Sequence, residues 1–148
     1  MGLFGPKGQP KQHTKARGEH AEAVIIARLL EVGYNVLTPY GDALRYDLVI
    51  EDADGQFWRI QCKLGWVNGE CIQFNTSSNH YHYKGGKDNM YRQGYQGQID
   101  YFAVYSPDTR KVYLVPVDHA GKTNMWLRLV PARSKNQHGI KMAEDYEL

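Results

Sequence analysis

Two segments with alternating polar and apolar residues, 45–51 and 56–64, flank the short sequence Asp52-Ala53-Asp54-Gly55. Alternation with a period of two is typical of a strand that has one buried face. A short Asp- and Gly-rich segment between two such runs predicts a β-hairpin. The second strand is expected to bury Trp58, Ile60, Cys62 and Leu64. Its opposite face carries Phe57, Arg59, Gln61 and Lys63.

The turn also predicts how the two strands are aligned. A three-residue loop over 53–55 pairs residue 52 with residue 56 and puts a glycine at the left-handed position that such loops favour. Asp47 then lies opposite Gln61, and Arg45 lies opposite Lys63. Because directly opposed side chains have Cβ atoms about 4.5–5.5 Å apart, Asp47, Gln61 and Lys63 are expected to form one cluster.

The residues before this hairpin predict a single helix. Thr14 can be its N-cap and Gly33 its stop, which gives a helix over roughly 15–32. Its second half is apolar on nearly every side, so we expect it to be buried against a sheet. The further expected elements are a flexible tail over 1–13, strands over 34–38, 70–76, 100–105, 111–117 and 124–130, a long polar loop over 77–98, and a polar C-terminal segment from residue 131. A helix followed mainly by strands indicates an α+β fold with a mixed central sheet, in one domain over 14–148.

Two glutamates on this helix add acidic groups near the hairpin. Glu19 and Glu22 are three residues apart, so they share one side of the helix, which continues through Ile26 and Leu29. A glutamate at the end of a buried stripe, together with an aspartate on the sheet, suits a hard cation such as Mg²⁺, which takes oxygen ligands. A neighbouring lysine can orient a water molecule or stabilise charge that develops on a phosphate.

Each of these residues also has an ordinary structural interpretation. Asp47 and Lys63 can form a cross-strand ion pair on the surface, and the two glutamates can be first-turn charges favoured by the helix dipole. Gln61 can be an exposed strand residue. Cys62 is expected to be a core residue rather than a nucleophile, because it belongs to the apolar face.

The charge of the chain is nearly balanced, with 18 Lys and Arg against 16 Asp and Glu. This excludes histone-like basicity, but the charges are sorted along the chain. Residues 1–18 carry four basic residues and no acid, and 109–141 carry seven basic residues and one acid, whereas acids concentrate in 42–54. The alternative is a solvated surface with accidental sorting. The chain also has no membrane-length apolar run, no signal-like start and only two cysteines, which predicts a cytoplasmic protein.

The order of these residues resembles the motif of the PD-(D/E)XK nuclease superfamily. The matching parts are Glu22, Asp47 within Arg45-Tyr46-Asp47-Leu48-Val49-Ile50, and Gln61-Cys62-Lys63. The segments 18–22, 59–63, 100–105, 112–117 and 139–148 are similar to the subgroup of homing endonucleases encoded in group I introns. The resemblance implies a restriction-endonuclease-like core, with the N-terminal helix packed on the mixed sheet.

The resemblance also implies roles for single residues, with Glu22, Asp47, Gln61 and Lys63 as the catalytic set. Asp47 would bind Mg²⁺, or alternatively Mn²⁺, with the backbone carbonyl of Cys62 as a second ligand. Lys63 would contact the attacking water or the scissile phosphate, and Glu22 would support the metal or the lysine. Gln61 departs from the usual Glu or Asp, and because an amide oxygen is neutral, weaker metal binding is expected.

The implied activity is sequence-specific, metal-dependent cleavage of double-stranded DNA. Two alternatives are a Holliday-junction or repair nuclease of the same fold, and a catalytically weak DNA-binding module. Because one site cuts one strand, a homodimer or homotetramer is expected, associated with the nucleoid through its DNA. Long polar side chains can read base edges, and basic ones can contact phosphates. The residues expected to contact DNA are Lys15, Arg17, Asn79, His80, His82, Lys84, Lys87, Arg92, Gln93 and Gln96.

Overall fold

The computed structural model describes residues 14–84, 87–134 and 138–148, so the expected tail over 1–13 lies outside the described residues. The chain begins with α1 (Thr14–Glu31). The central sheet has the spatial order β1 (Asn35–Leu37), β2 (Leu48–Glu51), β3 (Phe57–Leu64), β8 (Tyr101–Ser106), β9 (Lys111–Pro116). The second sheet has the order β10 (Asn124–Arg128), β5 (Cys71–Asn75), β4 (Trp66–Asn68). The remaining elements are β6 (Ser77–Lys84), β7 (Lys87–Gly94) and the 3₁₀ helices η1 (Val117–His119) and η2 (Ala143–Tyr146).

The central sheet is mixed, as the sequence predicts. Its strands β3 and β8 run parallel, whereas the other neighbouring strands run antiparallel. One helix packed on a mixed sheet confirms the α+β fold class. The expected strands from 34–38, 70–76 and 100 onward are present with ends shifted by one or two residues. The short strand β4 was not predicted, because Gly65 separates it from β3 by only one residue.

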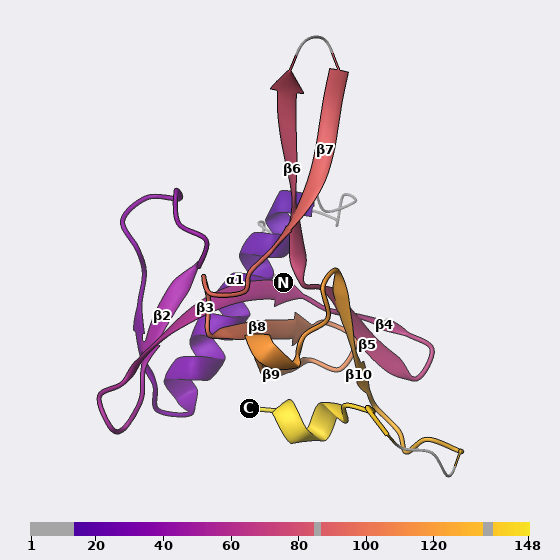
Figure 1. Cartoon of the computed structure of the whole chain (residues 1–148). Helices are drawn as coiled ribbons and strands as arrows, with labels where there is room; N and C mark the ends of the chain where they lie inside the picture. The colour runs from indigo at the N-terminus through magenta and orange to yellow at the C-terminus, as the bar shows by residue number, and fades with distance from the viewer. Residues whose placement is uncertain (1–13, 85–86, 135–137) are drawn as a thin grey trace, which may run out of the picture.

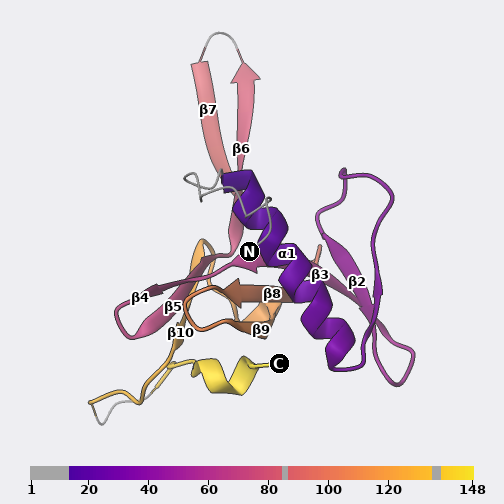
Figure 2. The ribbon, with the colours of Figure 1, turned by 180° about the vertical axis from the view of Figure 1, so that it is seen from behind.

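Helix α1 covers one face of the central sheet (Figure 2). Ala21, Ile25 and Leu29 recur every four residues and are buried against a cluster that includes Ile60 of β3. The helix is buried against the sheet as expected, but not all of its apolar residues are covered, since Leu30 is 55% exposed. A single sheet face can cover only one stripe of a helix, which leaves the other apolar residues at the surface.

The second sheet covers the opposite face of the central sheet. Phe74 of β5 lies in an edge-to-face contact with Phe102 of β8, with ring centroids 5.8 Å apart. Side chains alternate along β8, so that Phe102 belongs to this second cluster while Ala103 belongs to the cluster under α1. Gly65 allows the chain to cross from β3 into the second sheet, because a Cβ atom there would lie 2.8 Å from Val104.

The hairpin of β2 and β3 has the register that the turn predicts. Leu48 pairs with Ile60, and Gly55 has a φ of +74°, the left-handed conformation expected for it. Asp52 holds the loop with its carboxylate, which accepts from the backbone N–H of Gln56 at 2.9 Å. The predicted strand over 45–51 is too long, however, because β2 begins at Leu48. The alternation therefore ends there, and Tyr46 packs against the second cluster rather than beside Leu48.

The prediction of a long loop over 77–98 is wrong. Strands β6 and β7 form an antiparallel two-stranded sheet, here called the arm, which projects from the body of the molecule (Figure 1). The register runs from the pair Ser77 and Gly94 to the pair Lys84 and Lys87. The sequence of these strands has few apolar residues, so it lacks the apolar alternation that marks a half-buried strand.

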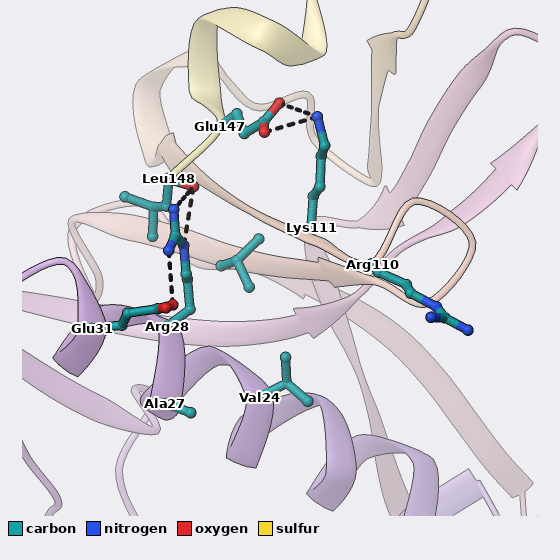
Figure 3. Close-up of a pocket in the computed structure, with 9 residues that line it drawn as sticks. Val24, Ala27, Arg28, Glu31, Arg110, Lys111, Glu147 and Leu148 are labelled. Carbon is teal, nitrogen blue, oxygen red and sulfur yellow. Dashed lines mark hydrogen bonds and ion pairs between the residues drawn. The ribbon is translucent and has the colours of Figure 1, made fainter.

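The C-terminal segment packs on the body rather than forming a merely polar tail. Ala143 in η2 is buried in the second cluster. Arg28 of α1 donates from Nη2 to the backbone oxygen of Leu148 at 2.7 Å, and Lys111 of β9 forms an ion pair with Glu147 at 2.8 Å (Figure 3). These contacts join the last residues to both α1 and β9. Among the described residues, no helix is long and apolar enough to span a membrane.

Candidate active site

Asp47 directly precedes β2 and lies beside β3. Its backbone N–H donates to the Ile60 oxygen at 2.9 Å, which holds the residue against β3. Its Oδ2 accepts two hydrogen bonds of 2.8 Å, from Nε2 of Gln61 and from the backbone N–H of Cys62. The structure thus brings Asp47 and Gln61 into direct contact, as the register requires.

Burial raises the pKa values of both acids of this cluster. The pKa of Asp47 is raised by its burial, although the Cys62 N–H and the charge of Lys63 act in the opposite direction. The pKa of Glu22 is raised by burial, by the charge of Asp47 and by that of Glu19. The half-buried Glu22 carboxylate on α1 therefore interacts electrostatically with the Asp47 carboxylate. Negative charge concentrated in this way favours a bound cation.

Lys63 is held beside the cluster by a tyrosine that the sequence did not single out. Its Nζ donates to the hydroxyl of Tyr95 at 3.1 Å. Tyr95 follows β7 directly and is only 5% exposed. Within the described residues, no ion pair joins Lys63 to Asp47, which argues against a simple surface salt bridge between them. The Lys63 side chain therefore lies near Asp47 while its hydrogen bond anchors it to Tyr95.

The donor groups at this site fit a cation that takes few protein ligands. No group of three or more His, Cys, Asp and Glu side chains in the described part of the chain has metal-binding geometry. Two carboxylates, of Asp47 and Glu22, approach each other, and the Ile60 carbonyl points toward β2. By the alternation of the strand, the Cys62 carbonyl points to the same edge, beyond the end of β2. Mg²⁺ is often bound by only one or two carboxylates, with water completing its shell.

Cys62 is a core residue, as its place on the apolar face predicts. Its side chain packs against the cluster beneath α1. Burial, together with the negative charges of Asp47 and Glu22, raises the pKa of its thiol well above the usual value. A thiol that stays protonated at neutral pH is a poor nucleophile, so only the backbone of this residue faces the chemistry.

The residues expected to contact DNA are divided between α1 and the arm. Lys15 and Arg17 are exposed in the first turns of α1, at the same end of the molecule as the arm (Figures 1 and 2). Asn79 and Arg92 are exposed and pair across β6 and β7. Side chains of the predicted residues His82, Lys84 and Lys87 lie outside the described residues.

Three other predicted contact residues have partners within the protein. His80 is half-buried and stacks on Tyr91, with ring centroids 5.4 Å apart. Gln96 is exposed, yet its Nε2 donates to the Val117 oxygen at 3.2 Å. Gln93 is half-buried at the base of the arm, and its backbone oxygen accepts from Arg45 Nη2 at 3.4 Å. These residues contribute to the root of the arm, whereas Asn79 and Arg92 are exposed along it.

Sequence reasoning missed the roles of Arg45 and Tyr95 in this region. The predicted alignment places Arg45 opposite Lys63. Although the pairing of β2 with β3 begins only at Leu48, both side chains meet the same tyrosine ring: Arg45 Cζ lies 4.1 Å and Lys63 Nζ 4.7 Å from the centroid of Tyr95. The predicted alignment of residue 45 with residue 63 could have indicated that Arg45 lies near the site. Tyr95 had no such signal, because it lies in a segment interpreted as a loop.

The chain is similar to nucleases in both sequence and structure. A sequence model of the PD-(D/E)XK endonuclease family matches residues 12–148. A bacterial homing endonuclease, I-Ssp6803I, has a similar solved structure, with a TM-score of 0.71 and 26% identity over 92% of this chain and 89% of that chain. A comparison with curated protein sequences gives no match. Because the family model covers nearly the whole chain, this protein belongs to the PD-(D/E)XK endonuclease family.

Proposed function

We propose that this protein is a sequence-specific, metal-dependent endonuclease that hydrolyses phosphodiester bonds in both strands of DNA, as a homing endonuclease. The observation that carries the proposal is the group of Asp47, Gln61 and Lys63, gathered at the end of β2 with Glu22 close to it. Membership of an endonuclease family and similarity to a homing endonuclease support it. The nuclease domain is proposed to span 14–148.

The proposed metal ion is Mg²⁺, with Mn²⁺ as an alternative. Asp47 and the Cys62 carbonyl would hold it, and Glu22 would add a carboxylate from α1. A bound divalent ion stabilises the negative charge that develops on a phosphate during hydrolysis. Lys63 would hold the attacking water or the scissile phosphate in place. Gln61 orients Asp47 through its 2.8 Å hydrogen bond.

As the pH falls, divalent-metal binding is expected to weaken at a higher pH than it would for carboxylates with ordinary pKa values. Carboxylates bind metal when deprotonated, and the pKa values of both Asp47 and Glu22 are raised above their usual range. Calorimetric titration with Mn²⁺ at successive pH values between about 7 and about 4 measures the effect. A Glu22→Gln variant is the control, and its affinity should depend less steeply on pH. A wild-type affinity that stays constant down to the ordinary carboxylate range would contradict the assignment.

Replacing Gln61 with glutamate is expected to tighten Mn²⁺ binding by about 10-fold and to lower the stability of the metal-free protein. The new carboxylate stands where an amide now donates to Asp47 at 2.8 Å, so two like charges meet without a metal. Calorimetry and thermal melting with and without Mn²⁺ measure the two effects. Gln73, a half-buried glutamine of β5 outside the cluster, gives the matched control Gln73→Glu. Unchanged affinity together with unchanged stability would show that Gln61 does not face the metal site.

The arm is proposed to carry the DNA-contacting residues. A two-stranded β-ribbon fits the major groove, where amide and guanidinium groups can read base edges. Asn79 and Arg92 are exposed on paired positions of this ribbon, and Gln93, His80, His82, Lys84, Lys87 and Gln96 complete the proposed set with Lys15 and Arg17 of α1.

Replacing Arg92 with alanine is expected to weaken DNA binding and, if the contact is to a phosphate, to lower the slope of log K against log salt by about 1. A base contact would instead relax specificity at one position and leave the slope unchanged. Fluorescence anisotropy over a salt series, without divalent cation, measures both. Arg133 lies outside the arm and is 93% exposed, so Arg133→Ala is the control. Equal affinity of Arg92→Ala and wild type for every DNA tested would remove the arm from the interface.

A homodimer or homotetramer is proposed because one active site cuts one strand and both strands must be cut. Sedimentation of the protein on its target DNA tests this proposal, and a monomer on that DNA would contradict it. A location in the cytoplasm, on the nucleoid, is proposed because the protein would bind DNA.

Cleavage of linear duplexes and four-way junctions, with Mg²⁺ or Mn²⁺, separates the proposed function from its alternatives. A homing-type enzyme cuts a particular linear sequence, whereas a junction nuclease cuts branched DNA of any sequence. A DNA-binding module binds without cutting in either metal. The exposed amide and guanidinium groups of the arm favour sequence reading.

A further inference from the structure

Arg45 joins the root of the arm to the body of the molecule. Its guanidinium donates from Nη1 to Ser78 Oγ of β6 at 2.6 Å and from Nη2 to the Gly94 oxygen of β7 at 2.9 Å. The same group donates from Nε to Gln98 Oε1 at 2.7 Å. A planar group with donors on three nitrogens can hold both strands of the arm at once, which a lysine ammonium cannot do with the same geometry.

The same guanidinium lies over the ring of Tyr95, 4.1 Å from its centroid. The hydroxyl of that ring accepts from Lys63 Nζ at 3.1 Å, and its edge packs against Phe102 with ring centroids 5.5 Å apart. Tyr95 is therefore held from two sides while it anchors Lys63. Arg45 also lies two residues before Asp47 in the sequence. It is therefore adjacent to Asp47 along the chain and linked to Lys63 through the ring of Tyr95.

His80 of β6 lies against the same guanidinium. Its Nε2 is 3.1 Å from Arg45 Nη1 and 2.9 Å from Ser78 Oγ, which itself accepts from Arg45. The His80 ring stacks on Tyr91 of the opposite strand. A continuous series of contacts thus runs from Tyr91 through His80, Arg45 and Tyr95 to Lys63.

We propose that Arg45 is a positioning residue that couples the arm to the active site. By holding both strands of the arm and the ring of Tyr95, it aligns Lys63 when the arm engages DNA. This inference rests on the proposed function, in which the arm binds DNA and Lys63 acts on the phosphate. Neither the family match nor the structural similarity assigns a role to Arg45.

Single-turnover cleavage at saturating protein, together with DNA affinity measured without divalent cation, tests this coupling. Arg45→Gln is expected to lower the saturated rate about 10- to 100-fold, because small displacements of reacting groups cost rate steeply. Arg45→Lys should not restore it, since the fork geometry is lost. Tyr95→Phe, which keeps the ring and removes the hydroxyl, should lower the saturated rate and leave affinity unchanged.

Arg59→Gln is the matched control for general loss of stability. Arg59 also makes side-chain hydrogen bonds to the segment after the arm, to the Gly97 oxygen at 3.2 Å and to Asp100 at 3.1 Å, but it does not touch Tyr95 or the arm. It is expected to keep the wild-type saturated rate. If Arg59→Gln and Arg45→Gln slow cleavage equally, or if Arg45→Gln weakens affinity alone, the positioning role is overturned.

An NMR measurement on the DNA-free protein keeps the inference testable apart from activity. The ring shifts of His80 and Tyr95 should differ between wild type and Arg45→Gln, because the guanidinium contacts both rings. Amide order parameters of β6 and β7 should fall in the same variant from the rigid value of about 0.85. Unchanged ring shifts, or an arm equally rigid without Arg45, overturns the coupling. Absence of cleavage by wild type with normal NMR results would instead overturn the proposed function.

Discussion

Replacing Lys63 with alanine is expected to lower the single-turnover rate of DNA cleavage by at least about 100- to 1000-fold. The Tyr95 hydroxyl holds the ammonium group near Asp47, and the group forms no ion pair with that acid. It can therefore contact a phosphate or a water molecule. A preorganised donor of this kind stabilises charge where it develops in the transition state. Rates at saturating protein with Mg²⁺ measure the loss.

The affinity of Lys63→Ala for DNA provides the internal control. One phosphate contact among many contributes little to binding, so affinity without divalent cation should change by no more than about 10-fold. Lys111→Ala removes a lysine from β9 that forms an ion pair with Glu147 away from the site, and it should cut at the wild-type rate. A Lys63→Ala protein that cuts within a few-fold of wild type would show that Lys63 has no part in the chemistry.

Replacing Asp47 with asparagine is expected to have opposite effects on activity and on stability. Removal of a metal-binding carboxylate should lower cleavage by about 1000-fold or more, since metal stabilisation of a phosphate contributes several kcal/mol. Calorimetry should show Mn²⁺ binding lost or weakened in parallel. Asp118, the acid of η1, gives the control variant Asp118→Asn, which should cut and bind metal as the wild type does.

The same substitution is expected to raise the melting temperature of the metal-free protein at neutral pH. Burial raises the folded-state pKa of Asp47 above its unfolded value. Stability from such a group is fully present below the unfolded pKa and is lost as the pH rises through the folded pKa. Asparagine has no charge to desolvate, and its carbonyl oxygen can accept from both the Cys62 N–H and the Gln61 amide, as Oδ2 of Asp47 does. A lower melting temperature for Asp47→Asn at neutral pH would contradict this account.

The strands that carry the site could be predicted because one of their faces is buried. Ile60 and Leu48 must lie on the same side of the sheet. A three-residue loop over 53–55 gives a strand pairing that satisfies this requirement. The predicted register places Asp47 beside Gln61, and the two are hydrogen-bonded although the regular pairing begins only at Leu48. Glu22 lies beside Ala21, the first residue of the buried stripe of α1, whereas helical spacing predicted it within the stripe through Ile26 and Leu29.

The arm could not be predicted from alternation because its sequence has few apolar residues. Its strands are held by backbone pairing and by polar contacts at the root, such as Arg45 with Ser78. The dipeptide Gly85-Gly86 between 84 and 87 is a hairpin signal within this polar segment. Tyr95 was missed for the same reason, since its burial depends on contacts with Phe102 and Lys63 that are distant in sequence.

Cleavage of a random-sequence duplex DNA library by the wild-type protein, followed by sequencing of the new ends, tests the proposed endonuclease activity. With Mg²⁺ or Mn²⁺, the new ends should recur at one shared sequence. With EDTA in place of metal, or with Asp47→Asn or Lys63→Ala in place of wild type, those ends should disappear. Wild-type protein that folds and binds DNA but produces no more ends with metal than with EDTA would show that it is not a metal-dependent endonuclease.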